Sequence, residues 1–99
     1  MTPVHWAFIH QTDGADPGRD SRTVVIGGCR VELVAVGTHD QAVPVARDLA
    51  ARGVQLIELC GGFGAVWTAR VIEAVEGRVP VGAVTYGAES LAGLRAVFP

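Results

Sequence analysis

The chain has 99 residues, 49% of them hydrophobic and 18% charged, with a formal net charge of −2. This length and composition predict one domain over residues 1–99 with an apolar core, and they exclude a second domain and a largely disordered chain. Its eight basic residues are all arginines and form no run, which argues against nucleic acid and anionic membranes as partners.

The first residues, Met1–His5, lack the basic start and apolar stretch of a secretory signal, and no apolar run approaches the roughly 20 residues of a membrane span. These features favour a cytoplasmic protein. Cys29 and Cys60 are too few for a disulfide framework, so we expect two free thiols. The three histidines are scattered without the spacing of a metal site, so we predict neither a metal nor a cofactor.

After a predicted first strand at Val4–Ile9, the motif Asp16-Pro17 is typical of a helix start, with a capping carboxylate before a proline. It predicts a helix over about residues 17–26 that ends at Gly27-Gly28. The β-branched run Thr23–Ile26 leaves a second interpretation open, in which this segment is a strand of a hairpin that turns at the two glycines.

A second strand is predicted at Arg30–Val36, because the segment is rich in valine and bounded by glycines. A helix is predicted at Gln41–Arg52, where apolar residues recur at helical spacing, and Gly53 ends it. Pro44 is compatible with this helix if Asp40 is the cap, because the proline then lies in the first turn.

The rest of the chain continues the alternation of strands and helices. The predicted elements are a strand at Val54–Leu59, a helix at Ala65–Glu76, a strand at Pro80–Thr85 and a helix at Ala88–Val97. A strand followed by a helix, four times over, predicts an α/β fold with a small four-stranded, mostly parallel sheet and helices on both faces. Such a sheet is either flavodoxin-like or half a β/α barrel, and we favour the open, flavodoxin-like sheet.

The helix predicted at residues 65–76 has a wide apolar face. Its polar residues Arg70 and Glu73 share one narrow sector, whereas its apolar side chains spread over roughly 200°, wider than the ~100° stripe that covers a single sheet. A second copy of the chain is the economical cover, so we predict a homodimer. The alternative is that Trp67 rests half exposed in a monomer.

Ligands of open parallel sheets bind beyond the carboxyl ends of the strands, where loops converge and helix N-termini present free N–H groups. Here that rule selects residues that end or follow the predicted strands. They are His10, Gln11, Thr38, His39, Asp40, Glu58, Cys60, Gly61, Gly62, Tyr86 and Glu89.

Glu58 is the most unusual of these residues, because its strand is expected to be buried on both faces. An unpaired buried carboxylate is costly and favours its protonated form, which suits a general acid or base. The structural alternatives are that Glu58 lies at the strand end in water, or that it pairs with an arginine such as Arg30.

Three further side chains are candidate catalytic groups. Cys60 begins a loop that leads into a helix, where a thiol ionises more readily, although a cysteine packed in the core is commoner. His10 and His39 stand at loop starts, where histidine can act as acid, base or hydrogen-bond donor.

The remaining candidates would bind rather than react. Gly61 and Gly62 would let the backbone approach an anion at the start of the following helix, although a plain tight turn needs glycine too. Gln11 and Tyr86 are the polar side chains that follow the first and fourth predicted strands. Together they predict a site for a small anionic metabolite.

The segment Glu58-Leu59-Cys60-Gly61-Gly62-Phe63-Gly64, with Ala7-Phe8-Ile9, Asp16-Pro17 and Val79-Pro80-Val81-Gly82, resembles a family of small bacterial proteins, the DUF6506 type. The resemblance extends over nearly the whole chain, and the first segment is its most specific part. It implies a compact α/β domain, but it implies no reaction and no site residues, because that family is uncharacterised.

Two functional hypotheses follow from the sequence. In the first, Glu58, His10, His39 and Cys60 take part in metal-independent proton transfer of the isomerase, lyase or cyclase type, and the glycine loop holds an oxyanion. In the second, the same loops hold a metabolite without catalysis, in a regulatory dimeric module. A structural dimer without a ligand is a third alternative.

Overall fold

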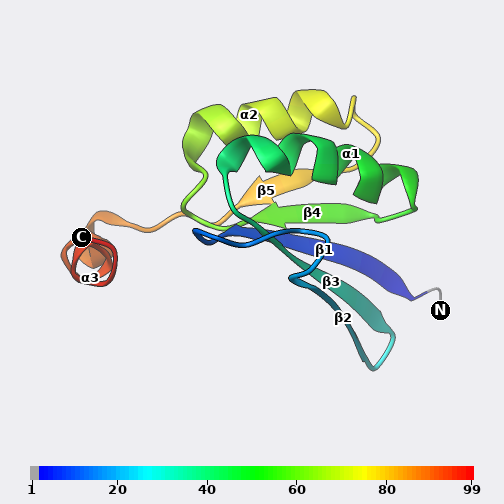
Figure 1. Ribbon diagram of the computed structural model, residues 1–99, viewed down its shortest axis with the longest axis horizontal. Helices are drawn as coiled ribbons and strands as arrows, with labels where there is room; N and C mark the ends of the chain where they lie inside the picture. The colour runs from blue at the N-terminus through cyan, green and yellow to red at the C-terminus, as the bar shows by residue number, and fades with distance from the viewer. Residues whose placement is uncertain (1–2) are drawn as a thin grey trace.

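The computed structural model describes residues 3–99, which form five strands and three helices (Figure 1). The strands are β1 (Val4–Gln11), β2 (Ser21–Ile26), β3 (Cys29–Val36), β4 (Leu56–Leu59) and β5 (Val81–Ala83). The helices are α1 (Ala42–Ala51), α2 (Gly64–Ala74) and α3 (Leu91–Val97), with short 3-10 turns η1 (His39–Gln41) and η2 (Ala88–Ser90) before α1 and α3. Within this part of the chain, no helix has the length and apolar composition needed to cross a membrane.

The strands form one mixed sheet in the order β2-β3-β1-β4-β5. The central strand β1 pairs in parallel with β3 and β4, and β4 pairs in parallel with β5. Strand β2 pairs antiparallel with β3 at one edge. The α/β class is therefore confirmed, but the four-stranded flavodoxin-like sheet and the half barrel are both wrong. The reason is that an antiparallel strand, β2, lies between β1 and β3 in the chain where a helix was predicted.

The helix predicted at residues 17–26 is wrong, and the hairpin interpretation is correct. Strand β2 ends in a β-branched run that suits a pleated strand, and Gly27 turns the chain into β3 with a φ of +59°, which favours glycine. The cap is nevertheless real. The Asp16 carboxylate accepts hydrogen bonds from the backbone N–H groups of Gly18 and Arg19, at 2.7 and 3.3 Å, but it caps a single turn.

The other predicted elements are confirmed, with bounds that differ by a few residues. Pro44 lies in the first turn of α1, as expected, so no helical hydrogen bond is lost there. The cap differs from the prediction, because η1 precedes α1 and is capped by Thr38 rather than Asp40. The Gln41 side chain accepts a hydrogen bond from the Gly37 N–H at 2.7 Å and holds the start of this segment against β3.

Both α1 and α2 cover the same face of the sheet, which we call the closed face (Figure 1). Apolar side chains from alternate positions of the strands meet the two helices there. The buried cluster consists of Ala7, Ile9, Val34, Val36, Ala42, Ala46, Leu49, Val54, Ile57, Leu59, Phe63, Val71 and Val75. The prediction of helices on both faces is wrong, because α3 lies beyond the end of the sheet instead of on its second face.

The opposite side of the sheet, the open face, also carries apolar side chains. Its residues follow from the strand register and from the alternation of side chains along each strand. They are Val4, Trp6, Phe8 and His10 of β1, Cys29, Val31, Leu33 and Ala35 of β3, Arg22, Val24 and Ile26 of β2, Leu56 and Glu58 of β4, and Gly82 of β5. No helix of residues 3–99 packs over them, so this face is largely apolar and accessible.

Candidate functional site

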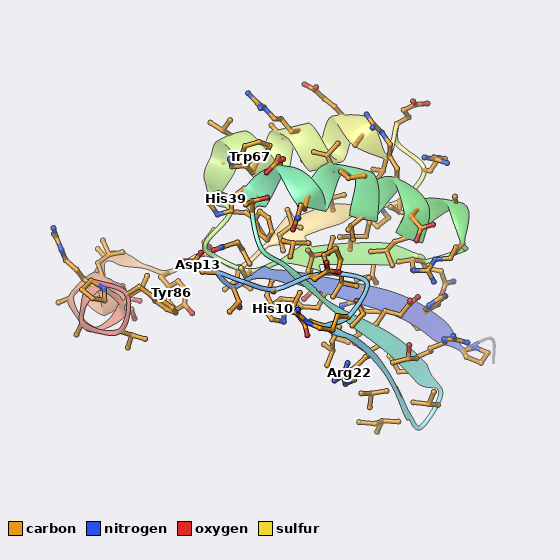
Figure 2. The ribbon with its side chains drawn as sticks, viewed as in Figure 1. His10, Asp13, Arg22, His39, Trp67 and Tyr86 are labelled. Carbon is orange, nitrogen blue, oxygen red and sulfur yellow. The ribbon has the colours of Figure 1, made fainter. Side chains whose placement is uncertain are left out.

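The parallel strands β1, β3, β4 and β5 all end at one edge of the sheet, which we call the strand-end edge. All the predicted site residues lie at or near it. The sheet nevertheless divides them, as Figure 2 shows for His10, on the open-face side, and His39, beside the helices. The site predicted as one cluster is therefore split between two sides of the sheet.

Three predicted residues from adjacent strands meet at the strand-end edge. Phe8 pairs with Glu58, and Ile9 accepts a hydrogen bond from the Cys60 N–H at 3.0 Å, so His10 and Cys60 are neighbours at the ends of β1 and β4. Side-chain alternation places His10 and Glu58 on the open face, whereas Cys60, which follows the strand, packs partly against the buried cluster of the closed face. The structure thus brings two of the four predicted catalytic residues to the open face and a third to the edge beside them.

His10 has a defined local setting. Its ring stacks near Phe8, with the ring centroids 6.3 Å apart, and its Nδ1 lies 3.2 Å from the Thr12 hydroxyl. Both contacts come from the same stretch of chain, so they orient the imidazole at the strand-end edge. The ring's other nitrogen, Nε2, is not engaged by any hydrogen bond within residues 3–99.

Glu58 is half-buried on the open face, so the expected burial on both faces is wrong. The reason is that α1 and α2 cover only the other face. The ion pair predicted as an alternative for Glu58 and Arg30 is also absent. In the sheet register Arg30 lies beside His5, whereas Glu58 lies beside Phe8, three residues further along β1. The Arg30 side chain is on the closed face. In the described part of the chain Glu58 forms no ion pair.

The glycine turn after β4 leads directly into α2. A Cβ atom on Gly61 would lie 3.1 Å from Cε2 of Tyr86 and 3.2 Å from the Val84 carbonyl oxygen, so the tyrosine ring lies against the Gly61 backbone. A Cβ on Gly62 would lie 3.7 Å from the Cys60 sulfur, an ordinary contact. The N–H groups of the two glycines donate to no acceptor within residues 3–99, and they lie at a helix N-terminus, which favours an anion.

His39, on the other side of the sheet, packs among aromatic rings. Its ring centroid lies 5.3 Å from that of Phe63 and 6.1 Å from that of Trp67, and the Arg70 guanidinium lies 4.6 Å from the centre of the Trp67 ring. Trp67 is therefore partly covered by its own chain and otherwise half exposed, as the alternative interpretation expected. Trp67, the largest side chain on the apolar face of α2, therefore gives less support to the predicted homodimer, although Ile72 of the same helix is exposed.

Gln11 has a structural role. Its side-chain amide nitrogen donates hydrogen bonds to the Gly37 carbonyl at 2.9 Å and to the Asp13 carboxylate at 2.8 Å. These bonds use both N–H donors of the amide and tie the end of β1 to the end of β3. The predicted binding role of Gln11 is thereby reduced to its carbonyl oxygen.

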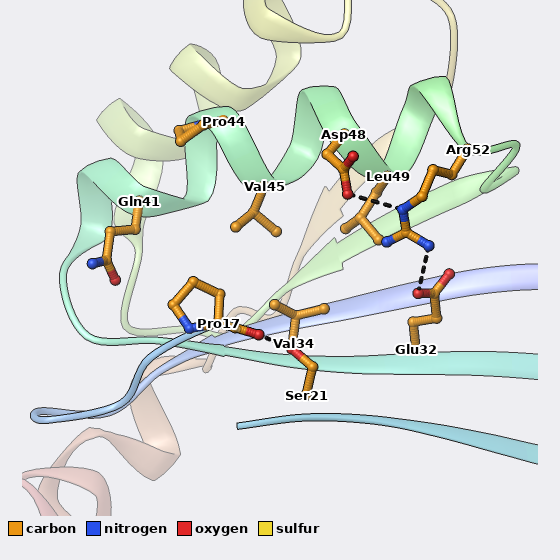
Figure 3. A pocket seen from close by; sticks show the side chains of 10 residues that line it. All are labelled: Pro17, Ser21, Glu32, Val34, Gln41, Pro44, Val45, Asp48, Leu49 and Arg52. Atoms are coloured by element: carbon orange, nitrogen blue, oxygen red, sulfur yellow. Dashed lines mark hydrogen bonds and ion pairs between the residues drawn. The ribbon is translucent and has the colours of Figure 1, made fainter. Parts of the chain in front are cut away.

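A cavity of about 360 Å³ lies between α1 and the β2–β3 hairpin, a location that sequence reasoning missed (Figure 3). It is lined by Pro17, Ser21, Glu32, Val34, Gln41, Pro44, Val45, Asp48, Leu49 and Arg52. The lining is mostly apolar, with an ion-pair chain at one end. A second hollow, of about 570 Å³, lies between the outer sides of α1 and α2, and of the residues selected from the sequence it includes Asp40 alone.

Glu32 organises the polar end of the first cavity. It is 8% exposed, and its two oxygens accept hydrogen bonds from Arg52 at 3.0 Å and from His5 at 2.5 Å. Burial raises the pKa of Glu32, but the two hydrogen bonds outweigh it, so the pKa is below its ordinary value. Since both carboxylate oxygens are engaged, we interpret this cluster as structural. The sequence feature that could have indicated this cluster is Glu32 itself, a carboxylate at a closed-face position of β3.

The possible metal ligands and the two thiols are dispersed over the described residues. Across residues 3–99 no three histidine, cysteine or acidic side chains are grouped as metal ligands would be. Both cysteines are free and half-buried. Cys29 starts β3 opposite Val4, whereas Cys60 follows β4 beyond Ile9, so the two thiols lie toward opposite ends of the sheet.

The family model of DUF6506, described as a family of unknown function, matches residues 4–99. The chain belongs to the DUF6506 family. The match includes every strand and helix from β1 to α3, so the resemblance based on the Glu58–Gly64 segment is confirmed. No curated protein and no solved structure matches this DUF6506 protein. Its function must therefore be inferred from its own geometry.

Proposed function

We propose that this DUF6506 protein binds a small anionic metabolite on the open-face side of the strand-end edge and performs metal-independent acid/base chemistry on it. The observation that supports this proposal is the register of β1 and β4. It brings His10 and Glu58 to one face at the carboxyl ends of the parallel strands, with Cys60 next to them at the strand end, where ligands of such sheets bind.

The residue types have complementary roles in this proposal. Glu58 and the free Nε2 of His10 can each take or give a proton, and their surroundings on the open face are apolar. The N–H groups of Gly61 and Gly62 hold the negative charge of the ligand, and the Tyr86 hydroxyl binds beside them. Proton abstraction and return by such groups corresponds to an isomerase, lyase or cyclase, with no cofactor.

The second candidate is a non-catalytic, ligand-binding homodimer with a regulatory role. The observation that favours it is the apolar composition of the open face, which suits a second copy as well as a substrate. His39 also supports this candidate, because it is held among aromatic rings across the sheet from His10. An enzyme that used both histidines on one ligand would need them on the same side.

Glu58→Gln separates these candidates, because it keeps the side-chain shape and removes the ability to exchange a proton. We expect thermal-shift titration with small carboxylates and phosphates to give a saturable rise in Tm for the parent protein. NMR in D2O should then show deuterium entering the bound ligand, and Glu58→Gln should slow this exchange by about a hundredfold. Exposed Glu73 of α2 supplies the control: Glu73→Gln should leave both readouts unchanged.

Gly62→Ala tests the anion contact independently of Glu58. Its new methyl group makes only an ordinary contact with Cys60, so the fold should be retained while the approach to the glycine N–H groups is blocked. Binding by the parent without deuterium exchange would favour the regulatory module. Equal binding by the parent, Glu58→Gln and Gly62→Ala would place any ligand elsewhere and refute the proposed site.

A further inference from the structure

We propose that two copies of the chain exchange their arms, defined as residues 84–99, so that α3 of each copy covers the open face of the other. The inference rests on the proposed homodimer and not on the identity of the ligand. It assigns a partner to two surfaces that lack one, and it adds a residue of the second copy to the proposed site.

Helix α3 makes almost no contact with its own chain. None of its residues is buried, and within residues 3–99 the only element it contacts more than marginally is η2, the turn directly before it. Leu91 is 53% exposed, and Phe98, directly after the helix, is 72% exposed. A seven-residue helix is marginal in water without tertiary packing, so its own chain does not account for its stability.

The arm is held at its start and then leaves the sheet. The Val84 N–H donates a hydrogen bond to the Leu59 carbonyl at 2.9 Å, and Tyr86 lies against Gly61, so the chain is anchored to the strand-end edge up to this point. Beyond it, α3 extends past the end of the sheet (Figure 1). This path leads away from the open face of the same copy and presents α3 to a neighbour.

The arm has one apolar stripe with a single charge beside it. Leu91, Leu94 and Phe98 follow one another at helical spacing, and Arg95 lies next to them on the helical wheel. Ala96 lies on the opposite side. In the described residues Arg95 forms no ion pair, so its charge is available to a partner.

The open face matches this stripe in extent and in charge. A helix of seven residues is about 10 Å long, which is two strand spacings, enough to cross β3, β1 and β4. In the middle row of the face these strands present Leu33, Phe8 and Glu58. Glu58 is the one carboxylate that the strands place on this face, and it has no ion pair within residues 3–99, so it complements Arg95 of a second copy.

In a reciprocal exchange, α3 of each copy packs on the open face of the other. Because a two-fold axis relates the two copies, each contact occurs twice in the dimer. It also completes the proposed site. The arm of the second copy forms a wall over His10 and Glu58, and its Arg95 adds a fixed positive charge to the glycine N–H groups that hold an anionic ligand. Among the residues that the described strands place on the open face the one arginine is Arg22 of β2, and two strands separate it from Glu58.

Sedimentation of the full chain over a range of concentrations tests the exchange. We expect the parent protein to sediment as a dimer at micromolar concentration and the double variant Leu91→Asp, Phe98→Asp as a monomer. Ala96→Asp, on the other side of α3, is the matched control and should remain a dimer. On the sheet, Leu33→Asp in the middle row of the open face should weaken the dimer, whereas Val25→Asp, on the other face of the sheet, should not.

The charge pair gives a second, independent measurement. Arg95→Glu and Glu58→Arg should each weaken dimerisation by about tenfold or more in Kd, and the double exchange should recover most of it. A parent that stays monomeric overturns the homodimer and the exchange together. A dimer that survives the α3 double variant, or a charge exchange without recovery, overturns the exchange alone. Neither result touches the ligand proposal, which is measured by thermal shift and deuterium exchange.

Discussion

The closed and open faces are built from the same strands but differ in what covers them. On the closed face Leu59 of β4 is fully buried beneath α1 and α2, whereas on the open face Leu33 of β3 is 37% exposed. Both positions follow from the same alternation of side chains. Alternation along the strands therefore determines which residues share a face, while the crossover connections determine which face becomes the core.

The two faces also treat a carboxylate differently. Glu32 on the closed face is buried, and both of its oxygens have partners in the chain. Glu58 on the open face is half-buried and forms no ion pair in the described residues. A carboxylate with all its partners stabilises a fold, whereas one without them is available for chemistry or for a second copy.

The largest expected effect contrasts two leucines. Leu59→Ala should lower the free energy of unfolding by about 2–5 kcal/mol, because it leaves a cavity in the packed core. Leu33→Ala should cost about 1 kcal/mol or less in the dissociated monomer, because its side chain is partly in water. Urea melts at low protein concentration measure both values. Equal losses would mean that the open face is as well covered as the closed one.

A smaller effect contrasts the two carboxylates. Glu32→Gln should destabilise the protein by about 1–3 kcal/mol, because Arg52 and His5 lose a charged acceptor for their hydrogen bonds. Glu58→Gln should change the free energy of unfolding by less than about 0.5 kcal/mol in the monomer. The same urea melts measure the free energy of unfolding of both variants. A large loss at Glu58 would show that it supports the fold.

The smallest expected effect is a slope with pH. The pKa of Glu32 is lowered in the folded state, so its stabilisation is present above the ordinary value of about 4.5 and is lost as the pH falls below it. Glu32→Gln should therefore flatten the stability curve in this range. Asp20, whose pKa a hydrogen bond from Arg19 lowers to about 2, contributes a further loss below about 3.8 in every variant. Parallel curves for the parent and Glu32→Gln would remove the assigned role of Glu32.

Most elements of the fold could be predicted from the sequence, because their periodicity is local. The helical spacing within Gln41–Arg52 and the valine-rich run of β3 need no distant partner to be recognised. The β2 hairpin was only the second interpretation, because the Asp16 carboxylate gives the same signal whether it caps one turn or a helix. Only the antiparallel pairing of Val24 with Val31, a tertiary contact, decides between them.

The covered face could not be predicted either. The residues of β1 are apolar on both sides, with Ile9 on one and Phe8 on the other, and this pattern is the same whether helices cover one face or two. The strand-end edge was predicted from parallel pairing, but its division was not, because His39 follows a loop whose path has no period. The cavity beside Glu32 was missed because it depends on how far α1 lies from β2.

In solution, we expect a second copy of the chain to cover the open face. Isotope-filtered NMR on a mixture of labelled and unlabelled chains tests it most directly. We predict nuclear Overhauser effects between copies that connect Leu91 and Phe98 of one chain with Phe8 and Leu33 of the other. If an equilibrated mixture shows no such effect between copies, and the Phe8 and Leu33 signals lie at the positions of a solvent-exposed monomer, that result would contradict the dimer.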